Sequence, residues 1–140
     1  MRTSFCEADR AALSRDLEEA REAGAWTFAA LLDEEGRAIV RTGRAARPAD
    51  TLAALSAAAL AAYRERVRLP GLVEGELHVV RLRGGPGLSL VLACLAGQAV
   101  LAVEHDLVRT THEEAARVVG VVAGRLLPTL HCGFDGCGRG

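Results

Sequence analysis

Residues 25–42 read AWTFAALLDEEGRAIVRT and predict the β-hairpin from which the rest of the fold can be worked out. Ala25–Leu32 is an apolar run whose residue types suit a strand, and Arg37–Thr42 mixes arginines with apolar residues on the way back. Asp33–Gly36 supplies the turn, because Asp bonds to its own backbone and Gly accepts a positive φ. Two paired strands are therefore expected over this stretch.

The next stretch, residues 49–68, reads ADTLAALSAAALAAYRERVR and predicts the strongest helix of the chain. Pro48 suits the first turn of that helix, since its missing N–H would be unpaired there anyway. Alanines cover most of the surface outside the stripe formed by Leu52, Leu55, Ala59, Ala62 and Tyr63. A helix with so little polar surface is normally buried on more than one side. One side would face its own sheet, and the other is predicted to face a partner.

Three further strands and a helix at each end complete the prediction. The strands are expected at Glu76–Arg83, Leu88–Leu95 and Gln98–Val103. One helix is expected over Ala8–Ala23, and a capping box at Thr111 opens another that ends at Pro128. The class is therefore α+β, an αββαβββα sandwich. Its five-stranded antiparallel sheet would carry the central helix on one face, with terminal helices completing the domain.

Composition excludes several classes of protein. The formal net charge of −1 argues against a nucleic-acid binder, which usually presents a basic face. Apolar residues 88–103 are too few to span a membrane, which takes about 18 or more, so no membrane insertion is expected. With no signal peptide recognised, we expect a cytoplasmic protein with reduced cysteines. The absence of lysine beside many arginines indicates a GC-rich, bacterial coding bias.

No set of residues predicts a reaction, so the chain is not expected to be an enzyme. His105-Asp106 and His112 flank the start of the last predicted helix, but the segment has the character of a solvated loop. The turn at 84–87, GGPG, lacks the Lys-Ser/Thr ending of a nucleotide loop, so no cofactor is predicted. Cys94 lies in an apolar strand and is expected to be a small core residue.

Two groups of residues are weaker candidates for a site. Soft metal ligands occur near the two ends of the chain, at His131, Cys132, Cys137 and Cys6. The cysteine spacing does not match that of zinc sites, so a metal or redox role is the minor alternative to a flexible tail. Arginines cluster around the second strand and its exit loop, and a charged partner could dock on them or they could form a solvated surface. They are Arg37, Arg41, Arg44 and Arg47.

The stretch Leu31–Val40, LLDEEGRAIV, resembles the first hairpin of the Roadblock / dynein light chain family. The Ala/Leu-rich helix that follows, and the three strands ending Leu101-Ala102-Val103, keep the order found in that family. The resemblance covers about residues 9–127. Similar hairpins occur in PAS, GAF, longin and profilin-like domains, but the alanine-rich helix between the second and third strands favours Roadblock. Residues 8–128 would form the domain, after an extension at 1–7 and before a Gly/Cys-rich flexible tail at 129–140.

The resemblance implies a function that the residues alone do not. Family members are usually homodimers or heterodimers in which two sheets join and the central helices pack together. Bacterial members, such as the gliding-motility regulators of the MglB type, bind small Ras-like GTPases as regulators or scaffolds. A non-enzymatic adaptor that pairs with itself or a paralogue and binds such a GTPase is thus expected. The predicted dimer interface contains Leu55, Ala58, Ala62, Ala54, Ala61, His78 and Val80.

Two other functions stay open at this point. A small-molecule sensor of the PAS or GAF kind would keep a cavity between sheet and helix. The small number of aromatic residues speaks against a specific pocket of that kind. A metal or redox switch in the Cys/His tail is the third reading.

Overall fold

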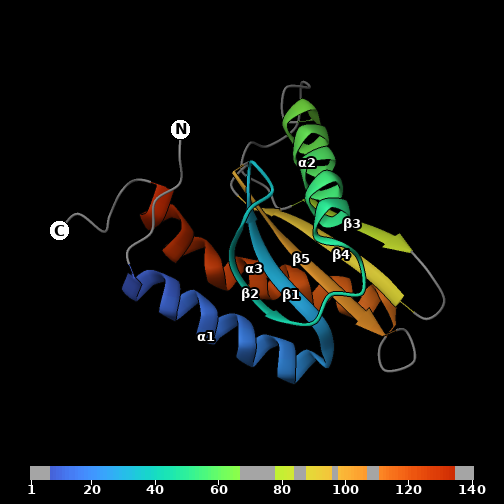
Figure 1. Ribbon diagram of the computed structural model, residues 1–140, viewed down its shortest axis with the longest axis horizontal. Coiled ribbons are helices and arrows are strands. Elements are labelled where there is room, and N and C mark those ends of the chain that lie inside the picture. Colours follow the sequence, from blue (N-terminus) through green and yellow to red (C-terminus); the bar gives the residue numbers. More distant parts are fainter. Residues whose placement is uncertain (1–6, 67–77, 84–87, 96–97, 107–110, 135–140) are drawn as a thin grey trace.

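The computed structural model describes residues 7–66, 78–83, 88–95, 98–106 and 111–134. Within these ranges the chain forms three helices and five strands in the predicted order (Figure 1). The helices are α1 (Glu7–Gly24), α2 (Ala49–Arg66) and α3 (His112–Phe134). The strands are β1 (Trp26–Asp33), β2 (Ala38–Gly43), β3 (His78–Arg83), β4 (Leu88–Leu95) and β5 (Ala99–Asp106). The predicted α+β class is confirmed.

The strands form one antiparallel sheet in the order β2-β1-β5-β4-β3. The two edges are therefore β2, from the first hairpin, and β3, which follows the central helix. Strands β1 and β5 pair over most of their length and lie in the interior of the sheet. Most of their residues are apolar on both faces, as expected where helices cover a sheet twice.

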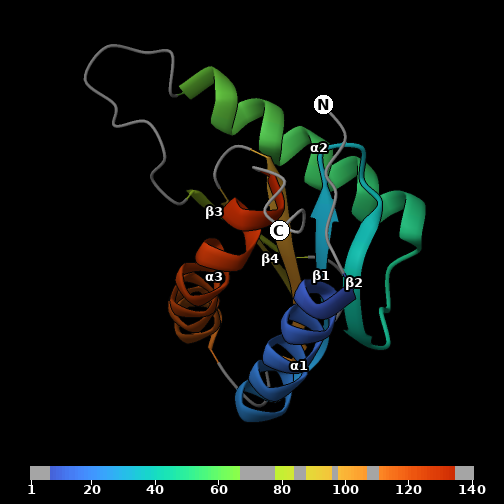
Figure 2. The same cartoon turned by 90° about the vertical axis from the view of Figure 1, so that its left-hand side faces the viewer.

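Helices cover the two faces unequally (Figure 2). Helix α2 lies on one face, and α1 and α3 lie together on the other. Leu17 of α1 and Val119 of α3 join Leu31 and Leu101 of the sheet in one buried cluster. Leu60 and Tyr63 of α2 join the strand residues of the opposite face in a second cluster. The strand residues divide between the two clusters because successive side chains of a strand point to opposite faces of the sheet.

The β1–β2 turn forms as its sequence predicts. The Asp33 carboxylate accepts hydrogen bonds from the backbone N–H groups of Glu35 and Arg37, each at 2.9 Å. Gly36 has a φ of 84°, and a Cβ there would lie 2.8 Å from the Cβ of Ala53 on α2. Glycine is thus required both by the backbone conformation and by the close approach of the central helix.

Two predicted boundaries were wrong. Strand β5 continues to Asp106, so His105 is a fully buried strand residue and Asp106 ends the strand. The prediction of a solvated loop at His105-Asp106 failed because charged residues at a strand end resemble a loop in sequence. Helix α3 contains Pro128 and runs to Phe134, so Thr129 to Phe134 are helical rather than tail. The predicted turn at 84–87 lies outside the described residues.

Candidate interaction surface on the central helix

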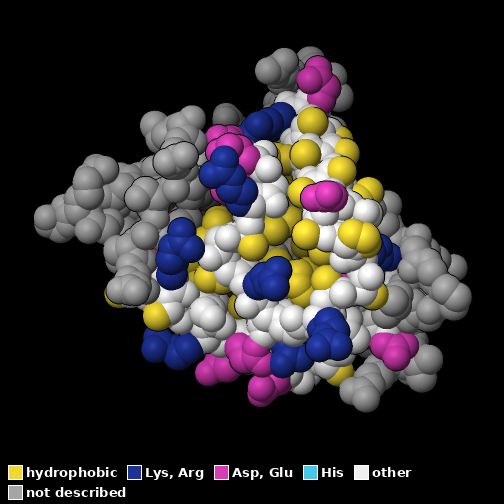
Figure 3. Space-filling model, viewed as in Figure 1, with side chains coloured by type: hydrophobic (Ala, Val, Ile, Leu, Met, Phe, Trp, Pro, Cys, Tyr) yellow, Lys and Arg dark blue, Asp and Glu magenta, His cyan; other side chains and the backbone are white. Residues whose placement is uncertain are grey.

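The outward side of α2 carries a continuous row of alanines. Ala54, Ala57, Ala58, Ala61 and Ala62 are exposed, at the spacings of three and four that align residues on one helix face. We refer to these five residues as the alanine face. Figure 3 shows hydrophobic side chains gathered along α2 on this side of the molecule.

The opposite side of α2 is buried against the sheet. Leu52, Ser56, Ala59, Leu60 and Tyr63 are at most 7% exposed. Of the apolar stripe described from the sequence, Ala62 is exposed, whereas Leu60, which lies outside that stripe, is buried. Leu60 and Tyr63 pack against the strand residues of this face, and toward β2 the space between α2 and the sheet opens into the groove described below.

Most residues predicted for the dimer interface can be placed on this surface. Ala54, Ala58, Ala61 and Ala62 belong to the alanine face, whereas Leu55 is half-buried and packs partly against the core beneath α2. His78 and Val80 belong to β3, at one edge of the sheet. An edge strand presents backbone groups with no neighbour on one side, which suits pairing with another chain. These placements leave the interface itself a prediction.

A groove lies on the same face of the sheet, between α2 and the edge strand β2. Its cavity volume is about 500 Å³. Phe28, Ala30 and Leu32 of β1 form its apolar floor, and Leu52 of α2 is one wall. On the other side, Arg41 of β2 and Arg44 of the β2–α2 loop line it.

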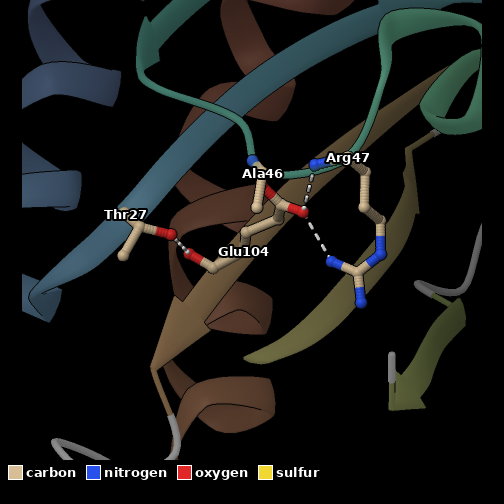
Figure 4. Close-up of polar contacts among 4 residues, drawn as sticks. All are labelled: Thr27, Ala46, Arg47 and Glu104. Carbon is tan, nitrogen blue, oxygen red and sulfur yellow. Dashed lines mark hydrogen bonds and ion pairs between the residues drawn. The ribbon is translucent and has the colours of Figure 1, made fainter. Parts of the chain in front are cut away.

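The loop between β2 and α2 is held down by a buried carboxylate (Figure 4). Glu104 of β5 is fully buried and accepts hydrogen bonds from the backbone N–H groups of Ala46 at 2.7 Å and Arg47 at 3.3 Å. Its second oxygen also forms an ion pair with Nη1 of Arg47 at 2.5 Å. Three donors compensate the cost of burying this charge. The Glu104 carboxylate thereby fixes the loop that leads into α2.

The four candidate docking arginines have different surroundings. Arg47 is only 14% exposed in its side chain and is committed to Glu104. Arg37 forms an exposed ion pair with Glu35 at 2.9 Å. Arg41 and Arg44 are exposed, and within the described parts of the chain neither has an acidic partner. The structure therefore leaves Arg41 and Arg44 as the two side chains of this group that are open to a partner.

The described residues provide no cluster of side chains for metal binding. Among them no group of three or more His, Cys, Asp or Glu side chains could hold a metal ion. Of the metal candidates, His131 and Cys132 lie within α3, while Cys6 and Cys137 fall outside the described residues.

His112 is the first residue of α3. The helix is capped by the Thr111 hydroxyl, which accepts a hydrogen bond from the backbone N–H of Glu114 at 3.1 Å.

Cys94 is a fully buried core residue on the α2 face, as predicted. Burial raises the pKa of the Cys94 thiol from 9.0 to about 11. Burial disfavours the thiolate, which is the reactive form of cysteine. Cys94 is thus inert at neutral pH.

Comparison with known proteins gives a structural match without a sequence match. No protein-family model matches the sequence, and no curated protein sequence does. A structure described as MglB with tetrameric arrangement matches with a TM-score of 0.70 and 21% identity, over 92% of this chain and 95% of that chain. Myxococcus xanthus MglB matches with a TM-score of 0.66 and 20% identity, over 86% and 95% of the two chains.

A Roadblock/LC7 domain from Streptomyces avermitilis matches with a TM-score of 0.54 and 19% identity, over 91% of this chain and 99% of that chain. The chain has the Roadblock/LC7 fold. Acanthamoeba castellanii profilin IA is similar too, with a TM-score of 0.56 and 19% identity over 82% and 96% of the two chains. At these identities the comparisons establish the architecture alone. They confirm the resemblance noted from the first hairpin and the alanine-rich helix.

Among the described residues, no helix is both long and apolar enough to cross a membrane.

Proposed function

We propose that the chain is a non-catalytic adaptor that dimerises through its central helix and binds a small Ras-like GTPase as a regulator or scaffold. The alanine face carries this proposal, because a row of five exposed apolar residues on one helix side has no role within a single domain. Small side chains let two helices approach closely, since the distance between packed helices depends on the residues at their contact. The Roadblock/LC7 fold, shared with MglB, supports the same conclusion.

In the proposed dimer, the edge strand β3 and the alanine face contribute to one association surface. Two sheets would join through β3, and α2 would pack against its counterpart in a second copy or a Roadblock paralogue. No charged side chain interrupts the row from Ala54 to Ala62, so packing there buries no unpaired charge. The adaptor is expected to act in the cytoplasm, where small GTPases are available to it.

Sedimentation equilibrium at micromolar concentration tests self-association. A mass of two or more chains is expected, and a monomer would contradict self-pairing. If the monomer pairs only on addition of a Roadblock paralogue from the same genome, the partner is the paralogue.

GTPase binding needs a separate experiment. A Ras-like GTPase encoded in the same genome, loaded with GDP or with a non-hydrolysable GTP analogue, is titrated into the labelled protein. We expect binding that depends on the nucleotide, and a changed rate of GTP hydrolysis if the role is regulatory. Absence of binding in both nucleotide states would contradict the GTPase assignment and leave the dimer intact.

A further inference from the structure

The groove between α2 and β2 lies apart from the surface assigned to self-association. Its walls include Ala49 and Leu52, which precede the alanine face along α2. Strand β2 forms one edge of the sheet and β3 forms the other. A dimer built on β3 and the alanine face would therefore leave the groove accessible.

The groove combines an apolar floor with two unneutralised positive charges. Phe28, Ala30 and Leu32 are alternate residues of β1, so their side chains repeat along the groove with the period of an extended chain. Arg41 lies opposite Ala30 in the β1–β2 pairing, and Arg44 lies at the end nearer the loop. Arg41 and Arg44 have no acidic partner in the described chain, whereas Arg37 and Arg47 each have one.

We propose that this groove binds an extended segment of a partner protein in which apolar side chains alternate with carboxylates. Alternate apolar side chains would lie on the floor formed by β1, since an extended ligand repeats its side chains at the same period. The carboxylates would pair with the guanidinium groups of Arg41 and Arg44, which form strong charge-assisted hydrogen bonds with such groups. Complementary charge favours acidic over basic segments and raises the rate of association.

One end of the groove is held in place by the buried carboxylate described above. Arg44 and Ala45 line the groove, and Glu104 binds the backbone of Ala46 and Arg47, the next two residues. The Arg44 N–H also donates to the carbonyl oxygen of Thr27 at 3.0 Å. Arg44 thus projects from a loop that is fixed before any ligand arrives, which lowers the entropic cost of binding.

A second hollow meets the groove at Arg44 and Ala45, and it fits this ligand less well. It is lined by Glu22 and Asp106 as well as by Arg21 and Arg44. Its carboxylates would repel an acidic ligand. The segment is therefore expected to run along β2 toward Gly36 rather than into the second hollow.

A displayed library of random linear peptides, selected on the full-length protein, tests the proposal. We expect enriched peptides to carry Asp or Glu beside Leu, Ile, Val or Phe, and to bind more weakly as salt increases. Changing Arg41→Glu and Arg44→Glu together should weaken binding of a selected peptide at least tenfold. The matched control changes Arg15→Glu and Arg125→Glu, two exposed arginines on α1 and α3, and should leave affinity within about twofold.

Two further comparisons separate charge from shape. Ala38→Trp, at an exposed position that lines the groove, should block peptide binding without altering the unfolding midpoint. A selected peptide with its apolar residues replaced by Ser should also lose binding. The proposal is overturned if no acidic apolar peptides are enriched, if both arginine double variants bind equally, or if the Ser peptide still binds.

The result is independent of the proposed dimer. Ala58→Glu, on the alanine face, should bind the selected peptide as tightly as the unchanged protein. Loss of peptide binding in that variant would show instead that the ligand occupies the alanine face, and would overturn the assignment to the groove.

Discussion

One face of the sheet packs against two helices, α1 and α3, whereas the other packs against α2 alone. The doubly covered face buries large side chains such as Leu17, Leu31 and Leu101 completely. The singly covered face also has a closed core under α2, but it leaves the groove beside β2 and the alanine face open. We propose that the first face mainly supplies stability, whereas the second also supplies surfaces for partners.

The largest expected effect comes from truncating one leucine on each face. Leu101→Ala, beneath α1 and α3, should lower the free energy of unfolding by about 3–5 kcal/mol, because a dry cavity remains in a closed core. Leu52→Ala should cost less, about 2–3 kcal/mol, because Leu52 lines the groove and water can enter the space. Urea denaturation at one fixed protein concentration measures both. Equal losses would contradict the difference between the faces.

Removing the buried carboxylate on the singly covered face should lower the free energy of unfolding by a smaller amount. Glu104→Gln removes the buried charge that pairs with the Arg47 guanidinium and should cost about 2–3 kcal/mol. The control Glu35→Gln removes an exposed ion pair with Arg37 and should cost less than about 0.5 kcal/mol. Thermal unfolding compares the two variants. If Glu104→Gln is as mild as its control, the carboxylate does not anchor the loop.

The alkaline stability of the protein should report the burial of Cys94 beneath α2. Because the pKa of this thiol is raised to about 11 in the folded chain, the unfolded chain ionises first. The contribution of this thiol to the free energy of unfolding is therefore fully present below about pH 9. It is lost as the pH rises toward 11, at about 1.4 kcal/mol per pH unit. Urea unfolding at several pH values measures the slope. Cys94→Ala should remove that slope, and an unchanged slope would assign it to other groups.

Local patterns in the sequence predicted much of this architecture. The Asp33–Gly36 turn, the alanine content of α2 and the apolar run of β4 are visible without any long-range information. The outward row from Ala54 to Ala62 follows from helical spacing.

The polar contacts of the singly covered face could not be predicted in the same way. Arg47 and Glu104 are 57 residues apart, and only the completed sheet brings them together. The sequence alone therefore places Arg47 with the arginines of a docking or solvated surface, and it assigns no role to Glu104. One signal was available in the sequence, because Glu104 directly follows the apolar run that ends at Val103. Side chains alternate between the faces of a strand, so Glu104 lies on the same face as Val100 and Ala102, which pack under α2. Pro128 misled the prediction of the last helix, because proline usually ends a helix rather than lying within it.

We propose that this chain associates through the singly covered face of the sheet, and through the alanine face of α2 in particular. Sedimentation equilibrium of Ala58→Glu and Ala11→Glu tests it most directly, since both changes put the same charge at an exposed helical alanine, on α2 and α1 respectively. We predict that Ala58→Glu weakens self-association at least tenfold, because the carboxylate would be buried unpaired between two helices, while Ala11→Glu associates like the unchanged protein. Equal association of the two variants would contradict the claim.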